Sequence, residues 1–502
     1  MRGLLLLVLC PALAFAQPVM ETKPTKIFTE VGGYYATDSR TPFWMQANQF
    51  GIVPKEIPRA SLRAGIQMDS WHNTLSARLK KKRVIGWGYG VEAVANAGAQ
   101  TITWVLPEAY IKGRLGAFEL MAGRRREVSG LADSTLGIGP YSISSNALPV
   151  PKIQLSLPEY TAIPFTKGVV AIRGSYAHGW FGNSGNIIQN YFLHQKTLYG
   201  RFGKPTWPVK FYAGFNHQVQ WGGRTNVLPE LLARNGQLPS SFKDYGDIVT
   251  GSSLGYRSVV DTTRISPFDR EHRIGNHLGT IDVGLELTLA KQYSVFLYRQ
   301  SIYEDGSLYY LINIQDGLHG LRLHNLKPAS TAFRIQDVVV EYLTTMSQGG
   351  EVFGDLADNR GRDNYFNHSQ YQSGWAYQGQ TLGTPFIPPG NDTYPSLPRY
   401  NFTNNNRVKV AHLGVSGSFG QGNTFALRCS YSLNAGVYDK PFPDNIWQFS
   451  TALKLGVPIS ARNGWLATAT IATDQGKLYE NSTGMYLGIR KTWEYYKYRI
   501  RN

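Results

Sequence analysis

Residues 251–255 match the pattern Gly-x-Ser-x-Gly, which in some hydrolases presents a nucleophilic serine, here Ser253. Such a serine lies on a sharp turn that follows a strand and precedes a helix. The residues on either side of Ser253 suggest neither element, and Gly and Ser are common in this part of the chain. The pattern therefore favours a flexible loop over a hydrolytic site.

A second group combines aromatic, amide, imidazole and guanidinium side chains, in residues 215–224 and again after residue 370. Aromatic rings can stack on the apolar faces of sugar rings, while amides hydrogen-bond to the sugar hydroxyls. The residues predicted to bind polysaccharide in this way are His217, Gln220, Trp221, Arg224, Tyr371, Trp375 and Tyr377. The alternative is that the aromatic residues mark a membrane interface beside a turn.

The sequence offers no motif for a metal, a phosphate group or a dinucleotide. It contains no His-Glu-x-x-His, no Cys pair and no phosphate-binding loop, and residues 86–90 lack the last glycine of a dinucleotide fingerprint. We therefore expect no cofactor, no metal ion and no catalytic residue.

The strands that must position these residues are predicted from apolar and polar residues that alternate with a period of two. In residues 447–455, Trp447 and Leu453 fall on one face of a strand, while Gln448 and Lys454 fall on the other. A Gly-rich aromatic stretch lies at 84–95, and similar alternating segments occur at 27–35, 61–68, 108–115, 118–124, 169–176, 192–201, 209–219, 283–290, 294–303, 334–344, 408–419, 425–433, 466–472 and 485–493. This recurrence predicts an all-β fold, a transmembrane antiparallel β-barrel of about 18 strands (16–18), with apolar residues facing lipid and polar residues facing the lumen.

Three irregular stretches interrupt the alternation, at residues 36–58, 221–277 and 348–406. The second should contain a short helix at 229–234, and the third is rich in Trp, Tyr and Asn. No Pro- or Ser-rich linker divides the 502 residues, so we predict one barrel domain over 17–502 with long ordered loops. Long loops of such barrels usually face outside.

Residues 1–16 read as a cleaved secretory signal peptide, with Arg2, an apolar run at 4–9 and Ala-Phe-Ala at 14–16. Cleavage would leave Cys429 as the single cysteine, which excludes an intramolecular disulfide. The mature chain has no apolar run long enough for a membrane helix. These features predict the outer membrane of a Gram-negative cell.

The formal net charge is +17. Nucleic acid is a common partner of strongly basic proteins. An exported barrel does not encounter nucleic acid, so we expect no nucleic-acid partner. Basic side chains spread along strands suggest a lumen or rim that faces an anionic partner, although a general solubility charge is an equal alternative. The predicted basic row of the lumen consists of Lys112, Arg114, Arg173, Arg428 and Lys454. Expected partners are capsular or other surface polysaccharide, outer-membrane lipids and lipopolysaccharide, and we expect a monomer.

Residues 34–39 (Tyr-Tyr-Ala-Thr-Asp-Ser) and 42–54 (Pro-Phe-Trp-Met-Gln-Ala-Asn-Gln-Phe-Gly-Ile-Val-Pro) resemble the start of the mature chain in Wzi-type capsule assembly proteins of Bacteroides-like bacteria. Residues 216–223 and parts of 365–385 are similar to later stretches of that family. The resemblance implies an outer-membrane barrel of about 18 strands that helps to attach or organise capsular polysaccharide without catalysis. Better-known members carry a periplasmic helical bundle near the N-terminus, whereas residues 36–58 offer no long amphipathic helix.

The main hypothesis is a non-enzymatic outer-membrane barrel that binds surface polysaccharide and assists capsule or exopolysaccharide assembly or attachment. A porin or transporter for small solutes or oligosaccharides is the first alternative, because polar lumen positions could line a water path. An outer-membrane hydrolase, which would need a His and an acid beside Ser253, is the weaker alternative.

Overall fold

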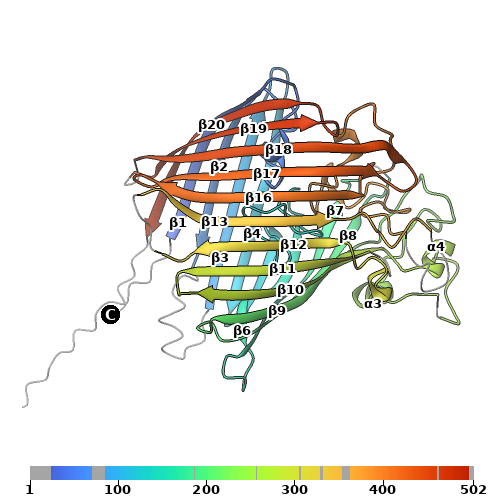
Figure 1. The fold of residues 1–502 in the computed structure, drawn as a ribbon. Coiled ribbons are helices and arrows are strands. Elements are labelled where there is room, and N and C mark those ends of the chain that lie inside the picture. Colours follow the sequence, from blue (N-terminus) through green and yellow to red (C-terminus); the bar gives the residue numbers. More distant parts are fainter. Residues whose placement is uncertain are drawn as a thin grey trace, which may run out of the picture.

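The computed structural model describes residues 24–70, 85–185, 187–255, 257–304, 307–327, 332–352, 362–460 and 463–496. The predicted signal peptide lies outside these residues. An antiparallel sheet of eighteen strands closes on itself as a barrel (Figure 1). Closure comes from β1 (Pro24–Ala36) and β20 (Ser482–Tyr496), which pair antiparallel from end to end of β1. The predicted β-barrel is confirmed.

The strands follow one another around the barrel in chain order. They are β2 (Arg59–Asp69), β3 (Ile85–Ala97), β4 (Ile102–Leu115), β5 (Phe118–Arg124), β6 (Lys152–Ala162), β7 (Val170–Gly182), β8 (Tyr191–Phe202), β9 (Val209–Trp221), β10 (Asn276–Leu289), β11 (Tyr293–Glu304), β12 (Gly317–Asn325), β13 (Arg334–Thr344), β16 (Val408–Phe419), β17 (Asn423–Gly436), β18 (Pro441–Ser460) and β19 (Trp465–Gly476). A separate hairpin is formed by β14 (Ala376–Tyr377) and β15 (Gln380–Thr381). Two barrel strands, β6 and β12, lie outside the segments that the alternation predicts.

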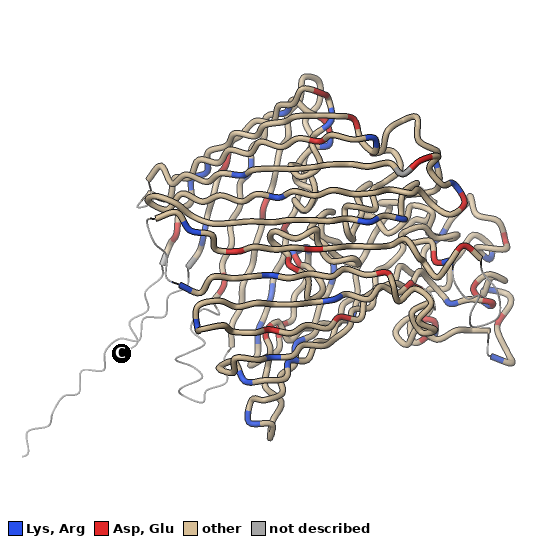
Figure 2. Tube along the Cα trace, viewed as in Figure 1, with Lys and Arg blue, Asp and Glu red and all other residues tan. Residues whose placement is uncertain are grey.

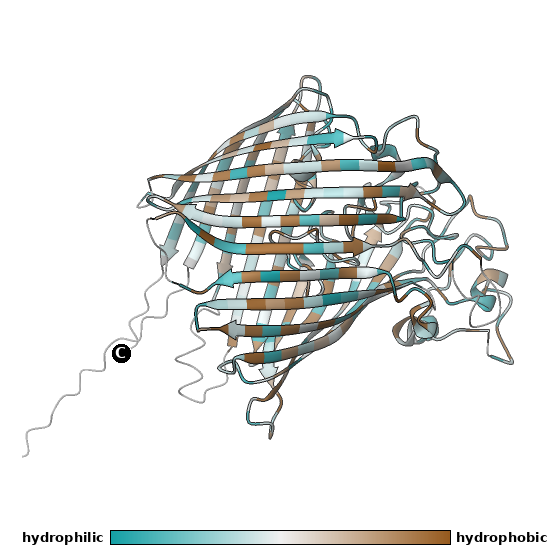
Figure 3. Ribbon diagram, viewed as in Figure 1, coloured by the Kyte–Doolittle hydropathy of each residue, from teal (hydrophilic) through white to brown (hydrophobic). Residues whose placement is uncertain are grey.

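Hydrophilic and hydrophobic residues alternate along many of the strands (Figure 3). In β18, Leu453 and Val457 are exposed on the outer wall, whereas Gln448 and Ser450 are buried inside. An apolar exterior around a polar interior is the pattern of a barrel that sits in lipid. No helix within the described ranges is long and apolar enough to cross a membrane.

The two ends of the barrel differ in the length of their connections (Figure 1). At one end the turns that the structure describes are short, such as residues 116–117 between β4 and β5. The other end carries the long connections, at 37–58, 125–151, 222–275 and 345–407. Long loops are extracellular in outer-membrane barrels, so we call this the outer end and the opposite one the inner end.

Residues 222–275 fold into a lobe at the outer end that contains α3 (Phe242–Thr250) and α4 (Pro267–Glu271). Ser241 caps α3 through a reciprocal capping box, which satisfies backbone N–H groups of its first turn. The helix predicted at 229–234 is wrong, because these residues form only a turn. Gly236, in a left-handed conformation, reverses the chain before a second helical turn can form.

Three outer loops fold into the mouth of the barrel and fill it. We call residues 40–57, 129–150 and 362–407 the plug. They supply nearly half of the members of one apolar core, in which Trp44, Tyr141 and Trp375 are almost completely buried. The first loop contains the single-turn helix α1 (Phe43–Gln46). The largest apolar core of this barrel therefore lies inside its mouth.

Carboxylates on the barrel wall hold the plug by accepting hydrogen bonds from its backbone. Glu341 on β13 accepts from the N–H of Ile138 (2.6 Å) and from the hydroxyl of Tyr298 (2.5 Å). Asp282 on β10 accepts from the N–H of Leu131 (2.9 Å). A buried N–H without an acceptor costs about 1–3 kcal/mol, so these wall groups allow irregular backbone to lie inside the lumen.

Replacing Glu341 with Leu removes the acceptor for Ile138 and keeps a side chain of similar size. We expect the free energy of unfolding to fall by about 1–3 kcal/mol, because a buried N–H is left unsatisfied. Looser attachment of the plug should also raise ion conductance. Urea titration in lipid vesicles and planar-bilayer recording measure the two effects.

Two variants of the same strand serve as controls. Glu341→Gln keeps a carbonyl acceptor and should retain most of the stability, and Val340→Leu changes only the outer wall. If Glu341→Leu unfolds and conducts like the unchanged protein, the plug does not depend on this hydrogen bond.

Candidate functional site

Gln220 lies at the outer end of β9, where the strand meets the plug. Its amide nitrogen donates to the backbone oxygen of Gly374 (3.0 Å), and its amide oxygen accepts from the Asn276 side chain on β10 (3.0 Å). The side chain is completely buried. Gln220 therefore ties the plug to the barrel wall.

Trp221 and His217, on the same strand, are also buried. The Trp221 ring packs against those of Phe192 and Tyr245, with ring centroids 5.1 Å apart in each pair. His217 Nε2 lies 2.9 Å from Nδ1 of His277 on β10. Tyr245 belongs to α3, so Trp221 fastens the lobe to the barrel.

Tyr371, Trp375 and Tyr377 are buried in the plug. Nε1 of Trp375 donates to the backbone oxygen of Ser142 (2.5 Å), which joins two of the plug loops. The hydroxyl of Tyr371 donates to the backbone oxygen of Gly222 (3.2 Å). These aromatic residues hold the three-dimensional shape of the outer end.

His368 is a partly buried residue of the plug beside Tyr371. Burial lowers the pKa of His368 to about 3, so the imidazole is neutral at pH 7. Its Nδ1 can then accept hydrogen bonds from the N–H groups of Gln370 (3.1 Å) and Tyr371 (3.3 Å). The neutral ring stabilises a turn beside Tyr371.

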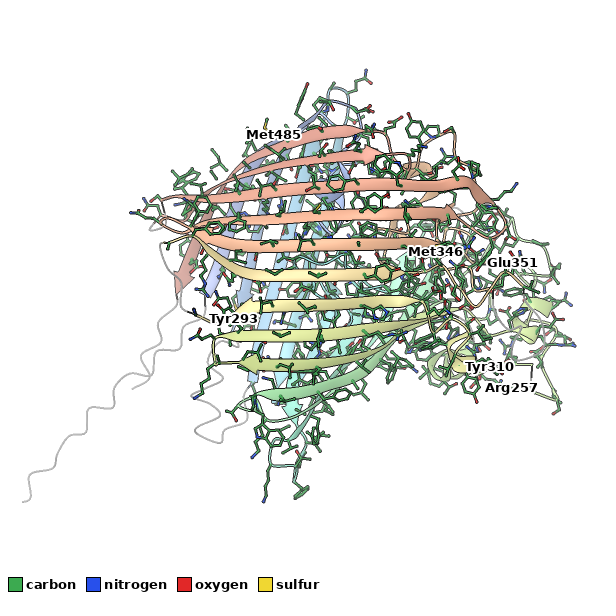
Figure 4. The ribbon with its side chains drawn as sticks, in the orientation of Figure 1. Arg257, Tyr293, Tyr310, Met346, Glu351 and Met485 are labelled. Atoms are coloured by element: carbon green, nitrogen blue, oxygen red, sulfur yellow. The ribbon has the colours of Figure 1, made fainter. Side chains whose placement is uncertain are left out.

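Arg224 differs from the other residues predicted to bind polysaccharide, because its side chain is exposed. Further exposed aromatic residues at the outer end are Phe242 (93% exposed), Tyr309 (85%) and Tyr394 (41%), none of which the sequence analysis singled out. Figure 4 shows Tyr310, the neighbour of Tyr309, beyond the ends of the strands. No local sequence signal identifies these residues, since their exposure depends on how the loops fold. We call Arg224, Phe242, Tyr309 and Tyr394 the outer surface residues.

Ser253 does not lie in a nucleophile elbow. The helix α3 precedes it and ends at Thr250, whereas an elbow requires a strand before the serine. The hydroxyl of Ser253 donates to the backbone oxygen of His272 (3.0 Å), which closes a turn in the lobe. Within the described ranges, no three His, Cys, Asp or Glu side chains are grouped to hold a metal ion.

Two members of the predicted basic row are neutralised on the lumen wall. Lys112 Nζ lies 2.6 Å from Asp69 and 3.3 Å from Glu119. Arg114 lies 3.4 Å from Glu159. Figure 2 shows this interleaving of basic and acidic positions along the strands. These cations mainly connect neighbouring strands.

Arg173 on β7 supports the plug. Its guanidinium lies over the rings of Tyr160 and Tyr199, 5.0 and 5.2 Å from their centroids. It also donates to the backbone oxygen of Gly130 (3.2 Å), at the edge of the plug. The guanidinium of Arg173 is thus stabilised by two aromatic rings and a backbone carbonyl instead of a carboxylate.

Arg428 and Lys454 line a cavity of about 720 Å³ between the plug and the inner half of the wall. Arg428 donates to the backbone oxygen of Thr135, and its guanidinium lies 5.3 Å from the ring centroid of Trp44. Lys454 is accessible from the cavity. Of the predicted basic row, these two residues are the ones that the structure brings together on neighbouring strands.

Comparison with known proteins gives a family and a fold. The family model described as capsule assembly protein Wzi matches residues 70–486. No curated protein sequence matches the chain.

Three solved structures are similar to this chain, and the first of them shows the likeness in fold. One is the Escherichia coli outer membrane protein Wzi, described as a carbohydrate-binding β-barrel involved in group 1 capsule assembly, with a TM-score of 0.56 and 14% identity over 92% of this chain and 83% of that one. Acinetobacter baumannii OccAB2 gives a TM-score of 0.47 and 11% identity over 94% of this chain and 98% of that one. Pseudomonas aeruginosa OccK3 gives a TM-score of 0.42 and 12% identity over 94% of this chain and 96% of that one.

The family match covers most of the chain and agrees with the eighteen-stranded architecture. It confirms the family and the outer-membrane location that the sequence predicts. This chain belongs to the Wzi family of capsule assembly proteins.

Proposed function

We propose that this protein binds surface polysaccharide at the outer end of the barrel and assists capsule or exopolysaccharide assembly or attachment. The observation that carries the proposal is the packed plug, which makes the outer end a platform instead of an open mouth. The family match supports a role in capsule assembly. The similar barrel from Escherichia coli is described as carbohydrate-binding.

The outer surface residues supply suitable chemistry for a polysaccharide. Phe242, Tyr309 and Tyr394 present aromatic rings to water, where stacking against sugar rings would remove apolar surface from solvent. Arg224 offers a guanidinium that can pair with a carboxylate of an acidic sugar. In this proposal the buried residues of the predicted site act indirectly, by holding the loops that display these groups.

The proposal includes no catalytic step. The hydroxyl of Ser253 faces a backbone oxygen and follows a helix, so its surroundings do not favour a hydrolase. A porin function, the other alternative, requires a water path through the plug. Complete burial of Tyr365, Phe366 and Trp375 in the mouth supports a closed barrel.

The outer wall suggests how the barrel meets its lipid surroundings. An apolar groove of about 530 Å³, lined in part by Val283, Leu297 and Leu321, has the character of a site for an acyl chain of a lipid or lipopolysaccharide. We propose that lipid covers this wall and that the protein acts as a monomer.

Changing Phe242 and Tyr309 together to Ser should weaken binding of the host's capsular polysaccharide. Loss of aromatic stacking, worth about 0.5–1.5 kcal/mol for each of the two rings, corresponds to a decrease in affinity of about fivefold or more. Pull-down of the polysaccharide by the purified barrel measures the effect, and retention of capsule on cells provides a second readout.

Phe165→Ser is the matched control, because Phe165 is equally exposed but lies in the turn between β6 and β7 at the inner end. It should leave polysaccharide binding unchanged. Equal binding by the double variant and the unchanged protein would argue against the outer surface residues as the contact site.

In planar bilayers the refolded protein should show little steady conductance, because the plug fills the mouth with packed side chains. Single-channel recording with and without the capsular polysaccharide tests this expectation. A large steady conductance that the polysaccharide does not alter would favour the porin alternative.

A further inference from the structure

The lumen cavity below the plug carries an excess of positive charge. Five cations line it: Arg63, Arg126, Arg428, Lys454 and Arg490. Two carboxylates, those of Glu30 and Asp337, line it as well. The excess charge belongs to two of these cations, because the other three are paired with acidic side chains.

Glu30 is surrounded by its own donors. The guanidinium of Arg490 lies 2.7 Å from it, that of Arg63 lies 3.3 Å away, and the hydroxyl of Tyr486 donates to it over 2.7 Å. The same Arg63 also lies 2.8 Å from Glu92, a wall residue next to the cavity. Two of the cations are therefore neutralised within the wall.

Arg126 and Asp337 are occupied in the same way. Arg126 lies 2.8 Å from Glu92. Asp337 lies 2.6 Å from Nδ1 of His324 and accepts from the hydroxyl of Ser416 (3.3 Å). Neither carboxylate of the cavity is thus left to neutralise the two remaining cations.

Those two cations, Arg428 and Lys454, are neighbours on the lumen face of β17 and β18. Lys454 pairs with Ala426 in the register and Arg428 pairs with Ala452, which places the two cations diagonally across the strands. Within the described ranges neither side chain has an ion pair, and the ammonium group of Lys454 makes no hydrogen bond. The Nε–H of Arg428 is buried and has no hydrogen-bond partner.

The rest of the lining suits a sugar better than a bare inorganic anion. Hydroxyl groups come from Thr424, Thr468 and Thr470, and the rings of Trp44 and Tyr486 border the same space. The volume of about 720 Å³ falls within the range of small-molecule sites. The cavity extends from the plug to residues close to the inner ends of β17 and β19, so a ligand would enter from the inner end.

We propose that this cavity is a binding site for an acidic saccharide, with Lys454 and Arg428 receiving a sugar carboxylate. The site lies on the other side of the plug from the outer surface residues. The inference therefore goes beyond the proposed function and does not depend on polysaccharide binding at the outer end.

The test is calorimetric titration of the purified full-length barrel with trigalacturonate, with neutral maltotriose and with inorganic phosphate. Trigalacturonate should bind and maltotriose should not. Lys454→Met should weaken trigalacturonate binding about tenfold, the factor expected for one lost charge-assisted hydrogen bond. Lys454→Arg keeps the charge and should retain most of the affinity.

Lys210→Met is the matched control. Lys210 also faces the lumen, but it lies 3.0 Å from Glu286 and outside the cavity, so the same loss of charge should leave trigalacturonate binding unchanged. The Phe242 and Tyr309 double variant should bind trigalacturonate like the unchanged protein, which separates this site from the outer one. Absence of trigalacturonate binding, binding of phosphate alone, or equal affinity in Lys454→Met would overturn the proposal.

Discussion

Backbone polar groups inside the barrel mouth need hydrogen-bond partners, and this constraint determines how the outer end is built. Loops that enter a lumen leave bulk water, yet they lack the regular pairing of a helix or sheet. Here the wall supplies the acceptors, and Asp282 and Glu341 are two of them. Glu304 on β11 accepts a hydrogen bond from the backbone N–H of Phe366 (3.1 Å). Asp474 on β19 accepts one from the backbone N–H of Phe43 (2.8 Å). Each plug loop is thereby fixed to the wall by at least one carboxylate.

This arrangement reverses the usual location of an apolar core in a globular protein. The outer wall exposes apolar side chains such as Leu453 and Val457, whereas polar side chains such as Gln448 and Ser450 are buried on the lumen face. Aromatic residues of separate plug loops then pack on one another in the mouth, as Trp44 does on Phe386 and Tyr141 does on Phe366. Hydrogen bonds from wall to plug position the loops, and apolar burial among the loops keeps the mouth closed.

Alternation along the chain is a local property, so the barrel could largely be predicted from sequence. In β18 the alternation of apolar and polar residues is uninterrupted. In β6, Pro158 lies where the pairing with β7 shifts register, between Leu157 and Thr161, so the alternation is broken and the strand is not predicted. The functional site was less predictable. Trp375 and Tyr309 are both aromatic residues in loops, yet Trp375 is buried through a hydrogen bond to Ser142, 233 residues away. A contact between residues so far apart in the chain cannot be predicted from the spacing of residue types.

The same constraint accounts for the uneven distribution of charge in the lumen. Carboxylates such as Glu341 and Asp282 serve the backbone of the plug, and others, such as Glu30 and Glu119, neutralise nearby arginines and lysines. Arg428 and Lys454 line the cavity and have no ion pair among the described residues, so water or a ligand must supply the partner. An anion entering from the inner end would meet two cations in a site where water is confined and electrostatic attraction is less screened than at the surface. A closed barrel can therefore carry a binding site on each side of its plug, one exposed and aromatic, the other enclosed and cationic.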